Sequence, residues 1–233
     1  MTRFIAHRGV HDVFTENTLD AFQRAVDLGF HAIELDVHVT ADGVCVVHHD
    51  ESITTPRVAL SIRGTFFETL HEAAPALPRL DTVLDLLAGK AHAHIELKNN
   101  GVEQHVAAVI GATRAEVSVH SFDHRTVLRM RGLLPQLRTG ILQTSRLVDS
   151  VSAMRAAAAT DLWQWHEFVD RALVEEVSVA GGNVIAWTAN TPSEWTVFAD
   201  MGVGGICTDL PISPTLASAQ GSSNRGPNLD AID

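Results

Sequence analysis

The chain alternates between short runs rich in β-branched residues and longer stretches whose apolar residues recur at helical spacing. Eight short runs predict strands, at residues 3–7, 31–37, 92–98, 116–121, 137–142, 161–165, 183–188 and 205–208. Seven longer stretches predict helices, at residues 18–28, 80–87, 102–113, 124–133, 147–158, 170–179 and 192–201. An eighth helix is expected after Pro211, because the fixed φ and missing N–H of proline suit the first turn of a helix.

Repeated alternation of strand and helix is the pattern of an α/β protein. Eight βα units in 233 residues predict a small TIM (β/α)8 barrel, a fold that typically takes about 250 residues. A doubly wound parallel sheet is the alternative, but such a sheet more often has fewer strands and a glycine-rich first turn. The pattern therefore favours the barrel.

The region after the second strand departs from this alternation. Two β-branched runs, residues 37–40 and 44–48, are joined by Ala41-Asp42-Gly43, a spacing typical of a β-hairpin. We expect this hairpin to extend the second strand past the barrel rim, and residues 51–77 to form a short insertion at the C-terminal face. We expect one domain over residues 1–218 and a disordered tail over residues 219–233, which are rich in Ser, Asn, Gly and Asp.

Composition narrows the range of partners. The chain is 45% hydrophobic and 19% charged, with 28 acidic and 17 basic residues and a formal charge of -11, so a nucleic-acid backbone is an unfavourable partner. No run of eighteen apolar residues predicts a transmembrane segment, and we expect a cytoplasmic protein. Cys45 and Cys207 stand singly in apolar runs and predict buried free thiols.

Acidic residues at strand ends provide the first candidate chemistry. Glu34 and Asp36 lie two residues apart on the second strand, so both point to the same face. Glu96 and Lys98 repeat this spacing on the third strand, which brings a third acid and a cation to the barrel mouth. Like charges in a low-dielectric site need raised pKa values or a cation between them. Three oxygen ligands therefore favour Mg²⁺ or Ca²⁺, and they also suit Mn²⁺.

Two of the thirteen histidines end predicted strands at the same rim. His7 precedes Arg8, which suits bidentate phosphate contact, and Gly9, which lets the backbone approach a ligand. His49 stands beside Asp50, a carboxylate that would fix the tautomer of its ring. Two histidines beside a metal suit general acid and base roles. For the other candidates we expect structural or solvated positions, namely for His11, His31, His71, His92, His105 and His124.

Taken together, these fragments resemble the glycerophosphodiester phosphodiesterase family. The matching motifs occur in the family's order at similar spacings: His7-Arg8-Gly9, Glu16-Asn17-Thr18, Glu34-x-Asp36, Thr40-x-Asp42-Gly43, His49-Asp50 and Glu96-x-Lys98. Later matches include Ser121-Phe122, Trp187-Thr188-Ala189-Asn190 and Gly205-Ile206-x-Thr208-Asp209-x-Pro211. Each fragment is short, but their joint order from residue 3 to residue 212 is specific.

The resemblance implies a metal-dependent phosphodiester hydrolase on a TIM barrel. It implies that His7 and His49 are the acid–base pair, and that Glu34, Asp36 and Glu96 bind the divalent cation. The cations Arg8 and Lys98 would neutralise phosphoryl oxygens in the transition state. His48 stands at a position that is apolar or variable in the family, so we expect it to be dispensable.

The sequence leaves three functions open. The first is hydrolysis of a small glycerophosphodiester to sn-glycerol 3-phosphate and an alcohol such as choline or ethanolamine. The second is a lysophospholipase D-like reaction at the same site, favoured if Phe66, Phe67 and Trp187 form an apolar groove. The third is a barrel that only binds phosphate ligands, against which the full set of residues needed for turnover is present. A monomer and a homodimer are both compatible with the sequence.

Overall fold

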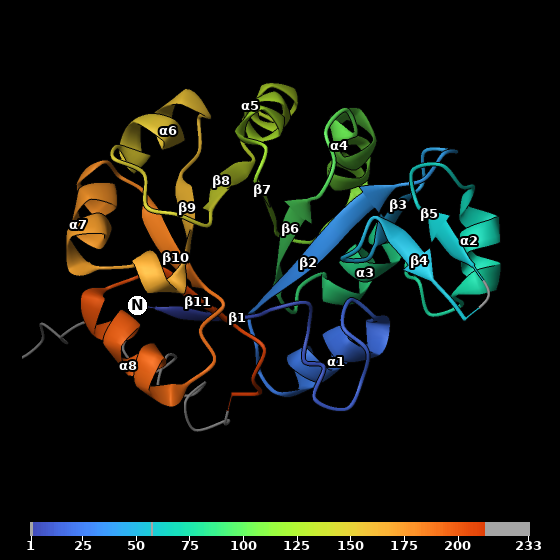
Figure 1. The fold of residues 1–233 in the computed structure, drawn as a ribbon, viewed down its shortest axis with the longest axis horizontal. Coiled ribbons are helices and arrows are strands. Elements are labelled where there is room, and N and C mark those ends of the chain that lie inside the picture. The colour runs from blue at the N-terminus through green and yellow to red at the C-terminus, as the bar shows by residue number, and fades with distance from the viewer. Residues whose placement is uncertain (1, 57, 213–233) are drawn as a thin grey trace, which may run out of the picture.

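The computed structural model describes residues 2–56 and 58–212. Eight parallel strands form the central barrel (Figure 1): β1 (Arg3–Ala6), β2 (Ala32–Val39), β6 (His92–Leu97), β7 (Val117–Ser121), β8 (Arg138–Gln143), β9 (Asp161–Trp165), β10 (Asn183–Trp187) and β11 (Gly205–Thr208). β1 pairs with both β11 and β2, which closes the sheet. The TIM barrel predicted from the sequence is therefore confirmed.

Helices on the outside of the barrel connect its strands and form an outer ring in Figure 1. They are α1 (Leu19–Asp27), α3 (Leu80–Leu87), α4 (Glu103–Ala112), α5 (His124–Leu133), α6 (Ser150–Ala156), α7 (Arg171–Val179) and α8 (Pro192–Met201), with a short 3-10 turn η1 (His166–Phe168). α6 begins three residues later than predicted, because the Asp149 side chain accepts a hydrogen bond from Ser152 N and caps the helix there. The helix expected after Pro211 and the tail at 219–233 lie outside the described residues.

The predicted hairpin follows β2. Strand β3 (Cys45–Val47) pairs antiparallel with the end of β2, and Gly43 adopts a left-handed φ of +81° in the turn. The insertion beyond it contains a second hairpin, β4 (Ser52–Thr54) with β5 (Ala59–Ser61), and helix α2 (Phe67–Ala73). Figure 1 shows this insertion beside the barrel, on its β2–β3 side. It packs on its own small apolar cluster: Val46, Ile53, Ile62, Leu70 and Leu77.

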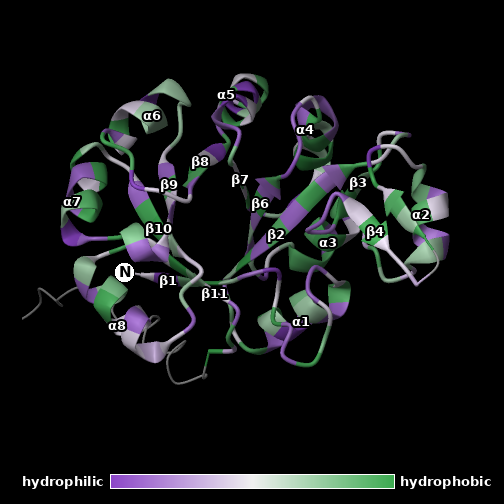
Figure 2. Ribbon diagram, viewed as in Figure 1, coloured by the Kyte–Doolittle hydropathy of each residue, from purple (hydrophilic) through white to green (hydrophobic). Residues whose placement is uncertain are grey.

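Side chains alternate between the two faces of each barrel strand, as the pleat requires. On β2, Ile33, Leu35 and Val37 belong to the large apolar core beneath the helices, whereas Glu34 and Asp36 point the other way. Figure 2 shows the resulting alternation of hydrophobic and hydrophilic bands along β2. Inside the barrel lies a smaller apolar cluster, formed by Ile5, Ala32, Leu142, Trp163, Ile185 and Cys207.

The structure also describes the two cysteines and the length of the helices. Cys45 and Cys207 are buried and unpaired, as predicted. In the described residues, no helix combines the length and the apolar character that crossing a membrane would need.

Candidate active site

A cavity of about 330 Å³ opens where the barrel strands end. Residues on or directly after all eight barrel strands and one residue of the β3 hairpin line it. They include most of the predicted site: His7, Arg8, Glu34, His49, Glu96, Lys98 and Trp187. Asp36 is buried beside them and pairs with Lys98 and Arg8. The sequence-predicted residues therefore come together at the C-terminal end of the barrel, where TIM barrels carry their active sites.

The turn after β1 fixes the first two of these residues. Arg8 and Gly9 both adopt left-handed φ values, of +56° and +80°. A Cβ on Gly9 would lie 2.7 Å from the carbonyl carbon of Ala21, so only glycine fits against α1 at this point. The turn leaves the Arg8 backbone N–H free to donate to Glu34 Oε2 at 3.2 Å.

His7 is held by a carboxylate from the last strand. Its Nδ1 lies 2.6 Å from Asp209 Oδ1, and Asn190 donates to the other oxygen of Asp209 at 2.6 Å. Burial alone would raise the pKa of Asp209, but the hydrogen bond and charge of His7 lower it well below its usual value. An ionised carboxylate only accepts, so His7 Nδ1 carries the proton and Nε2 is the atom that faces the site. His7 Nε2 lies 3.9 Å from Glu34 Oε2.

His49 repeats this arrangement on the returning arm of the hairpin. Its Nδ1 lies 2.8 Å from Asp50 Oδ1, the partner expected from the sequence. The hydrogen bond from His49 is the largest influence on the Asp50 carboxyl and lowers its pKa. His49 lines the cavity, whereas the neighbouring His48 does not. Of the two adjacent histidines, His49 therefore lies at the cavity, and the dispensability of His48 stays a prediction.

Three carboxylates crowd the floor of the cavity. Burial, followed by the charges of Asp36 and Glu96, raises the pKa of Glu34 well above its usual value. Burial also raises the pKa of Glu96, although Lys98 acts against it. Burial would raise the pKa of Asp36 too, but Lys98, Arg8 and a hydrogen bond from Asn17 lower it overall. The ionised forms of Glu34 and Glu96 are therefore unfavourable unless a further positive charge offsets them.

The two cations are already partnered within the site. Lys98 Nζ lies 2.9 Å from Glu96 Oε1 and 3.3 Å from Asp36 Oδ1. Arg8 Nη1 donates to Glu16 at 2.9 Å, and its Nε lies 3.1 Å from Asp36 Oδ2. Both side chains still line the cavity. The two cations face three carboxylates. Part of the negative charge of the carboxylates is therefore not offset.

His120 is a site residue that the sequence reasoning missed. Within the described residues, ligand atoms of Glu34, Glu96 and His120 lie within 4.8 Å of one another, a set that could hold a metal ion. Burial lowers the pKa of His120 to about 3, so its ring is neutral and able to act as a ligand. Its ring stacks on Trp163 at 4.0 Å. The sequence offered only its place near the end of a predicted strand, and the β6–β7 register of the structure sets it beside Glu96.

Asp209 was also missed as a functional residue, although it stood within a quoted motif. It is 202 residues from His7 in the sequence. The available signal was its place directly after the last strand, where a polar side chain reaches the same rim.

One side of the cavity is aromatic. Trp187 meets Trp165 edge to face at 5.2 Å and Phe122 at 5.6 Å between ring centroids. The insertion does not extend this surface, because Phe67 lines a separate cavity between the insertion, α1 and α3. The groove joining Phe66, Phe67 and Trp187 that was considered from the sequence is therefore absent from the described residues that line the active-site cavity.

Comparison with known proteins places this geometry in a family. Residues 7–213 match the model of the glycerophosphoryl diester phosphodiesterase family. The chain belongs to this family. It is accordingly an enzyme of the phosphoric diester hydrolase class. Its fold and the grouping of the motif residues at one barrel end agree with that membership.

Individual relatives cover nearly the whole chain. A glycerophosphodiester phosphodiesterase of Caldanaerobacter subterraneus is 30% identical over 232 residues, which cover 90% of this chain and 95% of the relative. A solved glycerophosphodiester phosphodiesterase of Agrobacterium tumefaciens is 26% identical with a TM-score of 0.78, over 94% of this chain and all of that one. An Oleispira antarctica phosphodiesterase, solved with the product sn-glycerol-3-phosphate, shares the fold with a TM-score of 0.83 at 22% identity, over 95% of this chain and 98% of that one.

Proposed function

We propose that this enzyme hydrolyses small glycerophosphodiesters to sn-glycerol 3-phosphate and an alcohol, with His7 and His49 as the acid–base pair. The observation that carries the proposal is the matched setting of the two rings. Each has its Nδ1 on an aspartate and lines the same cavity as Glu34 and Glu96. The Oleispira relative with bound sn-glycerol-3-phosphate supports this product.

The Nε2 atoms of His7 and His49 are the groups that would move protons. One accepts a proton from the attacking hydroxyl or water, and the other donates a proton to the leaving alkoxide. The aspartates hold the rings in one tautomer and stabilise the imidazolium that forms. Lys98 and Arg8 would offset the charge on the phosphoryl oxygens as the phosphorus centre is attacked.

A divalent cation fits the excess negative charge of this floor. Glu34 and Glu96 would hold it, with Asp36 and the neutral ring of His120 completing its surroundings. When bound, the cation would act as a Lewis acid that draws charge from a phosphoryl oxygen. Carboxylates suit Mg²⁺ and Ca²⁺, and the added imidazole favours Mn²⁺ over Ca²⁺.

The aromatic side of the cavity favours one kind of leaving group. Trp187, Trp165 and Phe122 line the cavity together with Arg8 and Lys98. If the phosphate of a diester lies at the two cations, its alcohol group would reach these aromatic rings. Aromatic faces attract quaternary ammonium groups by about 0.5–2 kcal/mol. We therefore expect a choline ester to be a better substrate than the corresponding glycerol ester.

The test is release of glycerol 3-phosphate by chelator-treated enzyme with Mg²⁺, Ca²⁺ or Mn²⁺ restored singly. Glycerophosphocholine, glycerophosphoglycerol and lysophosphatidylcholine serve as parallel substrates. We expect metal-dependent hydrolysis of the two soluble diesters, faster for the choline ester. Hydrolysis of the lysolipid alone would replace this substrate class by the lysophospholipase D-like reaction, and full activity without metal would remove the cation from the proposal.

A further inference from the structure

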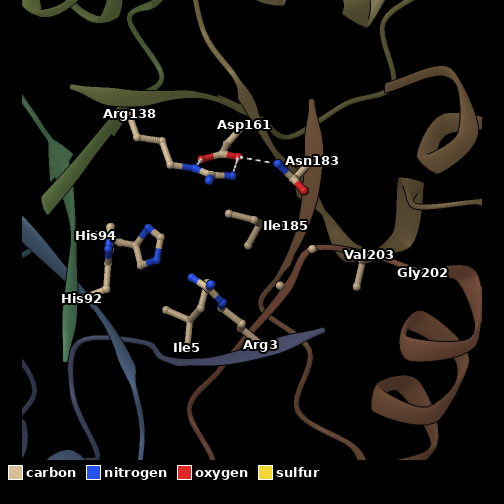
Figure 3. Close-up of a pocket in the computed structure, with 12 residues that line it drawn as sticks. Arg3, Ile5, His92, His94, Arg138, Asp161, Asn183, Ile185, Gly202 and Val203 are labelled. Carbon is tan, nitrogen blue, oxygen red and sulfur yellow. Dashed lines mark hydrogen bonds and ion pairs between the residues drawn. The ribbon is translucent and has the colours of Figure 1, made fainter. Parts of the chain in front are cut away.

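The barrel has a second cavity at its opposite end, where the strands begin (Figure 3). Its volume is about 250 Å³, and polar side chains from five strands line it: Arg3, His92, His94, Arg138, Asp161 and Asn183. Arg3 and His7 lie four residues apart along the first strand, so about 13 Å separates the two ends. The inner apolar cluster, including Ile5, Trp163 and Ile185, lies between them. This cavity is therefore separate from the active site.

One charge pair in this cavity is already neutral. Arg138 Nε and Nη2 bind the two oxygens of Asp161 at 2.6 and 2.5 Å, and Asn183 donates to the same carboxylate at 3.4 Å. The pair uses one edge of the guanidinium and leaves Nη1 of Arg138 without a hydrogen-bond partner in residues 2–56 and 58–212. Figure 3 shows this pair on one side of the cavity and Arg3 on the other.

Arg3 supplies a charge that the described part of the chain does not balance. Its side chain is exposed, and it forms no ion pair or side-chain hydrogen bond with residues 2–56 or 58–212. The N–H donors of its guanidinium are therefore available to a ligand. Two carboxylates at this end of the barrel pair with other residues, since Asp161 binds Arg138 and the exposed Glu116 lies 3.6 Å from His92 Nδ1.

A buried histidine completes the lining. His94 is only 8% exposed, and its Nδ1 shares a hydrogen bond with Ser118 Oγ at 2.7 Å. The same hydroxyl lies 3.1 Å from His92 Nε2, so the two rings are fixed by one serine. Nε2 of His94 has no hydrogen-bond partner among the described residues, and Figure 3 shows the ring between Arg3 and Arg138. Burial, followed by the neighbouring rings of His92 and His120 and then by Arg138 and Arg3, lowers the pKa of His94 well below its usual value.

We propose that this cavity binds a phosphate-type oxyanion, either inorganic phosphate or a phosphomonoester. Donors face it from separate sides, namely the free guanidinium of Arg3, Nη1 of Arg138 and the ring of His94. A tetrahedral anion offers acceptors in several directions, whereas a carboxylate offers them in one plane. The formal charge of the whole protein is -11, so only a local group of cations such as this one attracts an anion.

The test is calorimetric titration of the chelator-treated full chain with inorganic phosphate. The variant is Arg3→Met, which removes an exposed guanidinium that has no partner within residues 2–56 and 58–212. The matched control is Arg63→Met, which changes an exposed arginine of the insertion. We expect one phosphate site to weaken about ten-fold to a hundred-fold in Arg3→Met, which is the usual loss for charged hydrogen bonds. Arg63→Met should bind as the wild type does.

Three further arms complete the test. Hydrolysis of glycerophosphocholine should be unchanged in Arg3→Met, which separates this site from the proposed function. Titration with glycerol 3-phosphate distinguishes a phosphomonoester from free phosphate, and titration with acetate serves as the planar anion. Crystals of the wild type soaked in tungstate should show anomalous density between Arg3 and Arg138. Equal phosphate binding by wild type and Arg3→Met, tungstate absent from this cavity, or acetate bound as tightly as phosphate would overturn the proposal.

Discussion

At the residue scale, the two proposed catalytic histidines owe their state to their neighbours. His7 and His49 each place Nδ1 on an aspartate whose pKa is lowered, so each ring keeps its proton on that side. Asp50 is adjacent to His49 in sequence, whereas Asp209 reaches His7 only through the closure of the barrel. One His–Asp pair thus forms between neighbours in sequence, and the other forms by a tertiary contact.

The adjacent histidines give a controlled test of the catalytic assignment. His49→Ala should reduce turnover of glycerophosphocholine by at least about a hundred-fold, the scale of one general acid or base. It should leave metal affinity nearly unchanged, because His49 does not belong to the carboxylate and imidazole group. His48→Ala is the control and should retain activity. Initial rates and calorimetric metal titration measure both effects, and normal turnover in His49→Ala would contradict the assignment.

Asp209→Asn tests how His7 is held. Loss of the charge that stabilises the His7 imidazolium should lower kcat about ten-fold to a hundred-fold. The folded-state pKa of Asp209 lies below its usual value of about 3.9. Its ionised form therefore stabilises the fold above about pH 3.9, and this stabilisation is lost as the pH falls toward the lowered folded-state pKa.

The free energy of unfolding should therefore differ most between wild type and Asp209→Asn near neutral pH. The difference should shrink below about pH 4. Urea unfolding of both proteins at several pH values measures it. A difference that grows on acidification would show that Asp209 is not stabilised in its ionised form.

At the element scale, strand β8 must pass close to a large ring of β9. A Cβ on Gly140 would lie 2.8 Å from Trp163 Cδ1, and Trp163 stacks on His120 at 4.0 Å. A small residue in one strand thus allows a tryptophan in the next to support the floor of the active site. This packing explains why β8 carries a glycine inside a buried strand.

Gly140→Ala should lower the free energy of unfolding by about 1–3 kcal/mol, because the added methyl group overpacks the barrel interior. The matched change Gly132→Ala, in α5 where a Cβ meets nothing within 4 Å, should be neutral or stabilising by up to about 1 kcal/mol. Urea unfolding followed by the fluorescence of the four tryptophans measures the stability of both variants. Equal stability of the two variants would contradict this account of β8.

At the scale of the whole molecule, this acidic protein places positively charged side chains at both ends of its barrel. Lys98 and Arg8 stand among carboxylates at one end, and Arg3 and Arg138 line the cavity at the other. The carboxylate group costs stability when its charges are not offset, because like charges are buried together. A bound cation would therefore stabilise the folded state as well as support the reaction.

Glu34→Gln separates these two effects. It should weaken binding of Mn²⁺ or Mg²⁺ by about ten-fold or more, since even indirect partners of metal ligands have effects of this size. It should raise the melting temperature of the chelated protein, because it removes one of the crowded buried charges. Glu175→Gln, an exposed change of the same charge on α7, is the control and should alter neither. A Glu34→Gln protein that is less stable without metal would argue against charge crowding.

The cytoplasmic location, the choice between monomer and homodimer, and the single domain over residues 1–218 stay predictions. The sequence by itself determined the elements and the direction of their side chains, because the pleat of a strand and the pitch of a helix are local. Thus the spacing of Glu34 and Asp36 placed both acids on one face, and most helices end within a few residues of their predicted bounds.

Only the tertiary structure decided which of these inward side chains meet. Closure between β1 and β11 brings Asp209 to His7, and the β6–β7 register brings His120 beside Glu96. The same closure sets Arg3 opposite Arg138 at the other end of the barrel. Spacing along a strand fixes only the face and height of a side chain, whereas its neighbours depend on strand register and on the closing of the sheet.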